Sequence, residues 1–476
     1  MITKVLKLFI LTFCTVSYAL CQDLNQLPNT LEYRIDLKID YDTRKLFGIC
    51  EMKISNETDN PIEKVPILLY RLLTLKSVND ERDESLTYSQ SIMSISGWEE
   101  IQVNFIDISL NKILNPGEQQ TIILEYEGFL FGYSSEGWRY VKDHIDKNFT
   151  LIRTDGFGYP VIGYPSEKDM MKISQQQYDY LINITIPASL HAVTGGKLID
   201  IIGTGDEKTY VFRNKKQSWR LDIAISDYKT LEQGENRVYY FADDSISAQK
   251  IMKALQGAFN LYTSWFGPLD NYQGFSIIEV PEGYSSQQDI AAIILSAENF
   301  KESSDMRTIY HEIAHSWNVR NMEDQPSRFE TEGFAQFMQF RLLEELDKKG
   351  NAVSEAAEGY LDRVRNAFLA NKEYQTIPIK DYGIHEMTNY SYTLGMAVFA
   401  IFYELIDQEH FNNIIGTFYS DNHASGATLD EFIEHCIKLA PVDLKRFFKD
   451  WIYTTRGINL VVEGKTYDEL IDYYRE

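Results

Sequence analysis

The chain changes its hydrophobic period near residue 233, and this change constrains the fold more than any other feature of the sequence. In the first half, apolar and polar residues alternate over 33–41, 121–126, 180–186 and 210–213. A period of two is typical of strands with one buried face. Beyond this point apolar residues recur every three to four positions, which is the helical period. We therefore predict an α+β multidomain chain, with a β-rich N-terminal domain followed by a mainly helical one.

The predicted domains are residues 22–230 and 231–476, and a signal peptide is predicted over residues 1–21. Lys4 and Lys7 precede an apolar run over residues 8–16, and small residues follow before a polar stretch. This order is typical of a cleavable secretion signal. The prediction is therefore an extracytoplasmic protein, either secreted or periplasmic.

Charge and cysteine content exclude several classes of protein. The 476 residues include 46 Lys and Arg against 70 Asp and Glu, a net charge of −24, which disfavours nucleic acid as a partner. After the signal no segment is long and apolar enough to form an integral membrane span. Outside the signal, Cys50 and Cys436 lie far apart in different predicted domains, so we expect buried thiols and no disulfide framework. The sequence does not set the oligomeric state.

Several elements of the second domain can be placed from local signals. Ile251, Leu255, Ala258 and Leu261 share a helical face that ends at residues 265–268, and a strand is expected over 275–280. A helix is expected over 331–346, with Gly350 closing it. Another begins at Thr428, with Glu431 completing a capping box.

One of the predicted helices carries the pattern HExxH, at residues 311–315. Positions i and i+4 lie one helical turn apart, so His311 and His315 can present imidazole nitrogens to the same zinc ion. Glu312 is rotated by about 100° from His311, so it lies near the metal without needing to bind it. This is where a general base acting on water belongs. The alternative is a chance occurrence of the pattern in an ordinary helix.

A catalytic zinc ion usually has three protein ligands, so a third is needed. Glu332 follows at the start of the helix predicted over 331–346. A glutamate in a first helical turn also interacts favourably with the helix dipole, which is the alternative explanation for it. With HExxH upstream, Glu332 is the predicted third ligand.

These motifs resemble a known family. HEIAHSW followed by TEGFAQF is similar to the HELAHQW and NEGFA elements of the aminopeptidase N and leukotriene hydrolase family, which are zinc gluzincins. Residues 31–56, 265–268 and 448–451 also resemble stretches of that family. The resemblance implies a saddle-like N-terminal β domain, a thermolysin-like catalytic domain, one Zn²⁺ cofactor and peptide substrates, with Glu332 as the third metal ligand.

Two further site residues follow from the resemblance alone. Residues 286–290 align with the family's GxMEN segment, which places Asp289 where a glutamate holds the α-ammonium group of the substrate. A solvated acid in a turn is the alternative. Tyr392 matches the oxyanion-binding tyrosine of the family's YxKG element, although Leu394 replaces the lysine. A tyrosine that only packs its helix is the alternative there, and Tyr390 is the second candidate.

The chain departs from the family pattern in two other ways. The loop from residue 316 to 331 is shorter than is common, which the helix pair can absorb. The sequence stops soon after Trp451, so we expect a short form lacking the C-terminal helical domain, with a more open site.

The resulting prediction is a secreted zinc metallopeptidase that cleaves peptide bonds with zinc-activated water, and the resemblance implies that it is an aminopeptidase. The alternative is a secreted binding or adhesion protein on a catalytically silent peptidase fold. Hydrolysis of a nonpeptide electrophile such as an epoxide is a third hypothesis, resting on family analogy alone.

Overall fold

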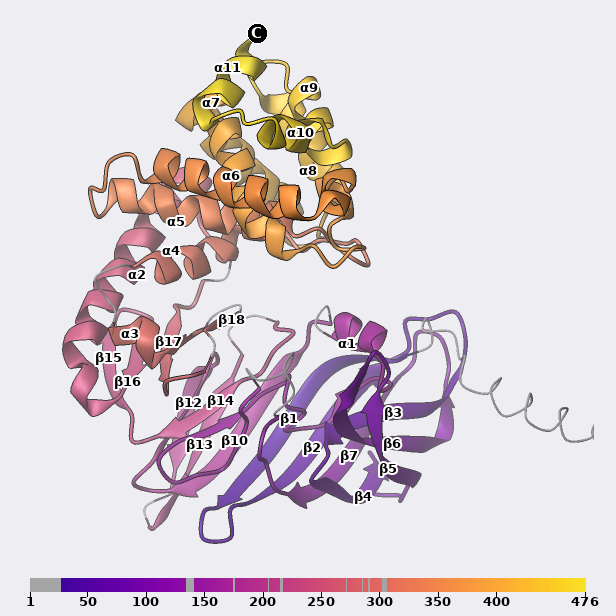
Figure 1. Cartoon of the computed structure of the whole chain (residues 1–476). Helices are drawn as coiled ribbons and strands as arrows, with labels where there is room; N and C mark the ends of the chain where they lie inside the picture. Colours follow the sequence, from indigo (N-terminus) through magenta and orange to yellow (C-terminus); the bar gives the residue numbers. More distant parts are fainter. Residues whose placement is uncertain are drawn as a thin grey trace, which may run out of the picture. The chain divides into compact units, whose positions relative to one another are not determined.

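The computed structural model divides into two compact units, Met1–Tyr228 and Lys229–Glu476. It describes residues 27–133, 141–173, 176–203, 205–214, 217–270, 272–284, 286–289, 292–301 and 306–476. The predicted signal peptide lies outside these residues. Figure 1 shows strands throughout the first unit and mainly helices in the second, so the predicted α+β fold class is confirmed.

The described residues of the first unit form three sheets and one short helix. The seven-stranded sheet has the order β12 (Lys197–Ile202), β13 (Glu207–Arg213), β10 (Asp179–Pro187), β1 (Asn29–Asp40), β2 (Lys45–Ser55), β7 (Gln119–Gly128) and β4 (Leu73–Asp80). The four-stranded sheet has the order β5 (Thr87–Ile95), β6 (Trp98–Leu114), β3 (Ile62–Tyr70) and β9 (Val161–Ile162). The three-stranded sheet has the order β11 (His191–Thr194), β14 (Ile223–Ser226) and β8 (Thr150–Ile152). The helix is α1 (Glu167–Ile173).

The apolar residues of the alternating stretches predicted from the sequence lie in the core of this unit. Tyr33, Ile35, Leu37 and Ile39 of β1 are buried, and β1 pairs antiparallel with β2 and parallel with β10. The other three alternating stretches fall inside β7, β10 and β13. Cys50 is buried as a free thiol in this core, and Cys436 is buried as a free thiol in the second unit, as predicted.

The second unit combines one small sheet with a group of helices. Its sheet has the order β15 (Lys229–Gln233), β16 (Asn236–Tyr240), β17 (Ser276–Val280), β19 (Ala292–Ser296) and β18 (Gln287–Asp289). The helices are α2 (Ser245–Phe266), α3 (Ala297–Lys301), α4 (Arg307–Ala314), α5 (Phe334–Glu345), α6 (Ala352–Ala370), α7 (Asn389–Asn422), α8 (Leu429–Leu439), α9 (Lys445–Phe448), α10 (Arg456–Val462) and α11 (Tyr467–Arg475).

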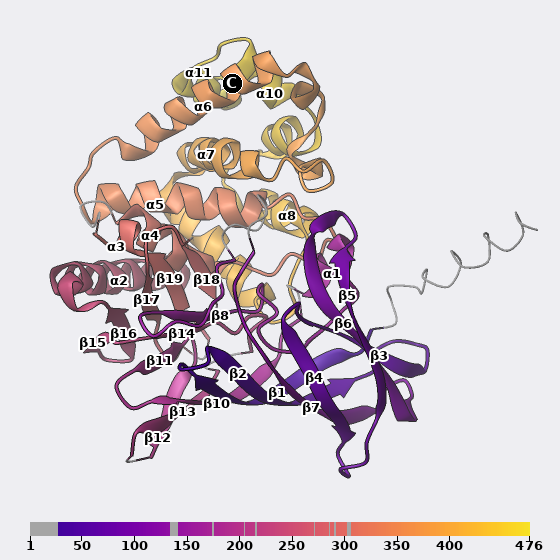
Figure 2. The ribbon, with the colours of Figure 1, turned by 60° about the horizontal axis from the view of Figure 1, so that its bottom comes forward.

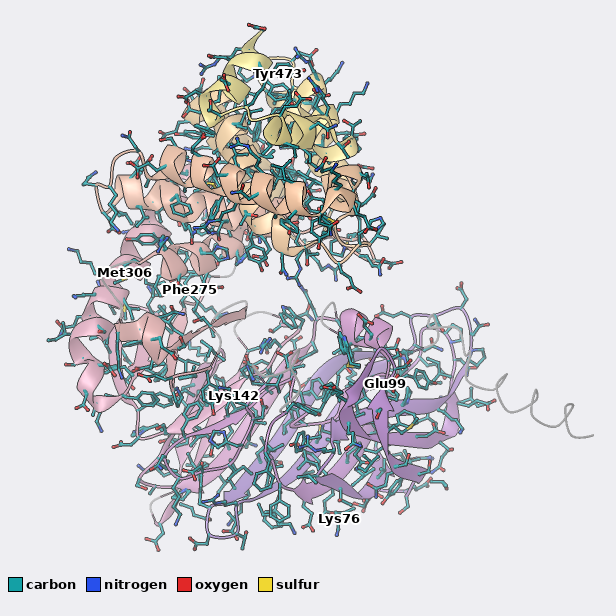
Figure 3. All side chains as sticks on the ribbon, in the orientation of Figure 1. Lys76, Glu99, Lys142, Phe275, Met306 and Tyr473 are labelled. Carbon is teal, nitrogen blue, oxygen red and sulfur yellow. The ribbon has the colours of Figure 1, made fainter. Side chains whose placement is uncertain are left out.

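A single apolar core joins this sheet and these helices. Figure 2 shows α2 alongside the small sheet and α4 next to α5, and Phe275 and Met306, labelled in Figure 3, are both part of the buried cluster. Helix α2 buries Ile251, Leu255 and Ala258 and ends at Phe266, as predicted, whereas Leu261 of the predicted face is only partly buried. Among the helices in the described ranges, none combines the length and the apolar character that crossing a bilayer requires.

One predicted helix differs from the structure at both ends. The segment predicted as one helix over 331–346 begins with a π-helical turn, Phe329–Gly333, and continues as α5 only from Phe334. It ends at Glu345, and Lys348, not Gly350, adopts the left-handed conformation that closes it. The predicted capping box at Thr428 and Glu431 is present at the start of α8.

Candidate metal centre

The two histidines of HExxH lie at the end of one helix. His311 is in the last turn of α4, and His315 opens a 3-10 turn, His315–Trp317, that tightens the end of this helix. The indole N–H of Trp317 donates to the carbonyl of Gly267 at 3.0 Å, just after α2. The hydroxyl of Tyr262, also on α2, donates to the carbonyl of Tyr310 at 3.0 Å. Helix α2 therefore fixes both sides of the histidine pair.

The third predicted ligand comes from the π-helical turn. Gly333, next to Glu332, lies so close to Gly395 of α7 that a Cβ atom on either glycine would approach the Cα atom of the other to 3.0 Å. The rings of Phe329 and Phe399 also stack, with centroids 4.8 Å apart. These contacts hold the turn against α7 and direct the Glu332 carboxylate towards the histidines.

The three predicted ligand atoms form a triangle of nearly equal sides. Nε2 of His311 lies 3.2 Å from Nε2 of His315, and Oε2 of Glu332 lies 3.5 and 3.4 Å from these two nitrogens. A tetrahedral zinc ion at about 2.0–2.1 Å from each ligand would separate neighbouring ligand atoms by about 3.3–3.4 Å. The triangle thus has the dimensions that one zinc ion requires.

The chemistry of these groups also fits a cation. Oε2 of Glu332 is buried and accepts no hydrogen bond within the described part of the chain. Burial alone would raise the pKa of Glu332, but the neighbouring His315 and His311 hold it well below its usual range through their charges. In the described residues these three side chains form the one group of His, Cys, Asp and Glu that could hold a metal ion.

Glu312 lies beside this triangle on α4. Its carboxylate is close enough for the charges of His311 and Glu332 to act on it, and burial raises its pKa to about 7. Such a carboxylate can take up and release a proton near neutral pH. This is the environment that the sequence predicts for a general base.

Tyr392 faces the same triangle from α7. Its ring is parallel to that of His311, and its hydroxyl is close enough for the charges of Glu332 and Arg328 to act on it. Burial raises the pKa of this phenol, so it stays protonated as a hydrogen-bond donor. Tyr390 instead packs edge-on against Phe368, with centroids 5.0 Å apart. Of the two candidate tyrosines, the structure brings only Tyr392 to the predicted ligands.

Asp289 is described by its backbone alone. It ends β18, an edge strand of the small sheet, and pairs with Ala292 of β19. Its side chain lies outside the described part of the structure, so its predicted contact with an α-ammonium group stays a prediction.

Two residues near the site were not predicted from the sequence. Arg328 precedes the π-helical turn in the left-handed conformation, at φ 62°, and its Nη1 lies 3.7 Å from Oε1 of Glu332. No sequence signal marks a left-handed arginine. Asn318 places its side-chain amide 2.7 Å from Nδ1 of His315. Its position, three residues after the second histidine of HExxH, is a signal that could have been noticed.

Comparison with known proteins decides the family. Residues 288–451, which include all the predicted site residues, match the peptidase family M1 domain. The chain carries an M1 peptidase domain. Residues 288–451 are therefore a zinc metallopeptidase domain, whose family uses one catalytic Zn²⁺, and the resemblance to the aminopeptidase N family is confirmed.

Solved structures of M1 enzymes share the fold. The M1 zinc metallopeptidase from Deinococcus radiodurans matches with a TM-score of 0.67 at 14% identity, covering 90% of this chain and 94% of that one. A variant of a two-domain M1 zinc metallopeptidase bound to L-arginine matches with a TM-score of 0.66 at 14% identity, covering 92% and 95% of the two chains. A comparison with curated proteins gives no match.

Proposed function

We propose that the M1 domain holds its zinc ion through His311, His315 and Glu332 and hydrolyses peptides from their free N-termini. The observation that carries the proposal is the triangle of Nε2, Nε2 and Oε2 atoms, with sides of 3.2, 3.5 and 3.4 Å, next to Glu312. When bound, zinc supplies the Lewis acidity that activates water and polarises a carbonyl group.

The residues of the chain supply the proton transfers and one hydrogen-bond donor. Glu312 takes a proton from the attacking water and passes it to the nitrogen of the leaving amine. Tyr392 donates its hydroxyl proton as a hydrogen bond to the carbonyl oxygen as that atom gains negative charge. A protonated phenol suits this role, because an ionised one could not donate.

Action on free N-termini is supported by relatives and by the alignment of residues 286–290 with the family's GxMEN segment. Variants of M1 relatives have been solved with a Tyr-Ser-Ala substrate, with L-arginine and with L-tryptophan. Free amino acids are the products that an aminopeptidase releases. In this chain Asp289, on the edge strand β18, is the proposed partner of the substrate's α-ammonium group.

A peptide digest tests this function. The zinc-loaded protein is incubated with matched peptides that carry a free or an acetylated N-terminus, with and without 1,10-phenanthroline. We expect stepwise removal of N-terminal residues from the free peptides alone, and no cleavage with the chelator. Internal cuts in acetylated peptides would reject aminopeptidase specificity, and an absence of any cleavage would favour a silent binding protein.

Variants of the site separate metal binding from chemistry. Glu312→Gln should keep one zinc ion per chain and lose nearly all hydrolysis, because the amide cannot accept the proton. His311→Ala should lose the zinc as well. His385→Ala, on an exposed loop of the same unit, is the matched control and should keep both. A Glu312→Gln protein with full activity and bound zinc would remove Glu312 from the mechanism.

We further propose that the chain is exported through residues 1–21. The basic start at Lys4 and Lys7 and the apolar run that follows support this. Expression of the full chain followed by N-terminal sequencing of the exported protein tests it. The expected mature protein starts near residue 22, and replacing both lysines by glutamate should reduce export. A protein that stays in the cytoplasm with Met1 intact would contradict the proposal.

A further inference from the structure

We propose that Asn318 is a positioning residue that orients His315 for zinc through its side-chain carbonyl. This proposal rests on the assignment of His315 as a zinc ligand. Asn318 follows the 3-10 turn His315–Trp317, and its backbone N–H donates to the carbonyl of His315 at 3.0 Å. Side chains at i and i+3 eclipse each other in a 3-10 turn. The end of the helix therefore places the Asn318 amide directly against the His315 ring.

The hydrogen bond between these two side chains sets which ring nitrogen is available to zinc. Nε2 of His315 faces His311 and Glu332, whereas Nδ1 faces the Asn318 amide at 2.7 Å. A neutral imidazole has one protonated and one bare nitrogen, and a metal binds the bare one. Zinc at Nε2 therefore requires a proton on Nδ1, and that proton requires an acceptor on Asn318.

The acceptor on Asn318 is its Oδ1 atom. In the structure the amide nitrogen, Nδ2, faces the ring, which would set two donors against each other once zinc is bound. In that orientation Oδ1 is buried and accepts no hydrogen bond within the described part of the chain. The oxygen and nitrogen of an amide have nearly the same shape, so their placement follows from hydrogen bonding. Turning the amide by 180° places the buried oxygen on Nδ1 of His315.

The two histidines differ in this respect. Nδ1 of His311 is buried and has no hydrogen-bond partner among the described residues. His311 is instead flanked by the parallel ring of Tyr392. Loss of a hydrogen-bond acceptor behind a ligating histidine weakens metal binding by about 10–100-fold. Asn318 should therefore contribute strongly to zinc affinity, through His315 alone.

Zinc affinity of the metal-free protein tests this role directly. Zinc is titrated into apo-protein in competition with a chromogenic chelator, for the wild type and for Asn318→Leu, Asn318→Ala and Asn318→Asp. We expect about 10–100-fold weaker binding for the first two, which lack an acceptor. Asn318→Asp keeps a carboxylate oxygen in place and should stay within about threefold of the wild type. Asn413→Leu makes the same exchange on the exposed face of α7 and should bind zinc as the wild type does.

A spectroscopic readout distinguishes orientation of the ring from a general effect on folding. In protein labelled with ¹⁵N-histidine, the zinc-loaded wild type should show His315 protonated at Nδ1, with a slowly exchanging proton. In Asn318→Ala that proton should exchange rapidly, and Asn318→Asp should restore it. Far-UV circular dichroism of each apo-protein checks that the fold is kept. If both apolar variants unfold, the comparison of Asn318→Asp with the wild type still tests the proposal.

The possible outcomes separate this proposal from the proposed function. If His315→Ala abolishes zinc binding while Asn318→Leu and Asn318→Ala bind as tightly as the wild type, the role of Asn318 is overturned and the zinc site stands. Asn318→Asp binding 10-fold or more weaker than the wild type would likewise overturn it, since its acceptor is retained. If the wild type itself binds no zinc, or His315→Ala binds it unchanged, the zinc site as proposed fails first.

Discussion

The ring of Tyr392 lies parallel to the ring of His311, with their centroids 6.2 Å apart and their planes inclined by 8°. This contact joins α7 to α4, the helix at whose end both histidines lie, although about 80 residues separate His311 from Tyr392 in the sequence. It also brings a protonated phenol next to the predicted zinc ligands, where the proposed function needs a hydrogen-bond donor. The ring contact does not involve the hydroxyl of Tyr392, so the hydroxyl can donate a hydrogen bond to a substrate carbonyl oxygen.

Replacing Tyr392 by phenylalanine tests this hydroxyl. Tyr392→Phe should lower kcat by about 10²–10³-fold with little change in KM, because the donor acts on charge that develops in the transition state. Zinc content should not change. Tyr390→Phe is the matched control, since Tyr390 packs among Phe368 and Tyr374. Equal losses in both variants would mean that Tyr392 acts only through packing.

Arg328 offers a second prediction at the same site. Its Nη1 lies 3.7 Å from Oε1 of Glu332, and its charge also acts on the Tyr392 hydroxyl, so its removal should affect both groups. Arg328→Met should lower kcat about tenfold, which corresponds to a loss of about 1.4 kcal/mol of transition-state stabilisation. The exposed Arg363→Met on α6 is the control.

A double-mutant cycle shows whether Arg328 acts through Tyr392. In the Tyr392→Phe background the effect of Arg328→Met should shrink to less than about threefold, because the hydroxyl on which its charge acts is gone. Effects that multiply independently would contradict a shared role.

The sequence predicted the residues of the site better than the backbone that holds them. HExxH fixes the spacing of His311 and His315 through helix geometry alone, and Glu332 was found as the first acid of a following helix. The π-helical turn under Glu332 could not be predicted, because it depends on the close approach of Gly333 to Gly395, a tertiary contact. Arg328 directly precedes this turn, and its left-handed conformation could not be predicted either, because it depends on the same tertiary packing.

The fold class followed from hydrophobic periodicity, which burial requires of any strand or helix. Alternation predicted β1, and its apolar residues are buried. The order of the seven strands could not be predicted, since β1 pairs with β10, a strand more than 100 residues later. Local patterns set which residues face a core, whereas pairing depends on how the whole chain packs.

Glu279 gives a prediction about stability and pH. It lies in β17 and accepts from the backbone N–H of Phe241 at 2.8 Å. Burial raises its pKa to about 8, and Asp244 adds to this increase. An unfolded glutamate has a pKa of about 4.3. Between these values the folded state holds a proton that the unfolded state lacks, so this residue's contribution to stability falls as pH rises, by at most about 1.4 kcal/mol per pH unit.

Glu279→Gln should remove this dependence. The free energy of unfolding of the variant, relative to the wild type, should increase from pH 5 to pH 8 and then level off. Urea denaturation at pH 5, 6.5, 8 and 9 measures it. Glu355→Gln makes the same charge change at an exposed site on α6 and is the matched control. A difference that stays constant with pH for Glu279→Gln would contradict a raised pKa.

The close approach of Gly333 and Gly395 predicts that even one methyl group there disturbs the zinc site. A Cβ atom on Gly395 would lie 3.0 Å from Cα of Gly333, so α7 and the π-helical turn must separate to admit it. Gly395→Ala should lower the free energy of unfolding by about 1–3 kcal/mol, as overpacking does. It should also weaken zinc binding, because the same turn carries Glu332 and aims it at the histidines.

Gly359→Ala is the matched control. Gly359 lies in α6, and no described heavy atom is within 4 Å of where its Cβ would be. Alanine there should stabilise the helix by about 0.5–1 kcal/mol and leave zinc affinity unchanged. Urea denaturation and zinc competition on both variants make the comparison. If Gly395→Ala loses stability but binds zinc like the wild type, then Glu332 is held by something other than the packing of its turn on α7.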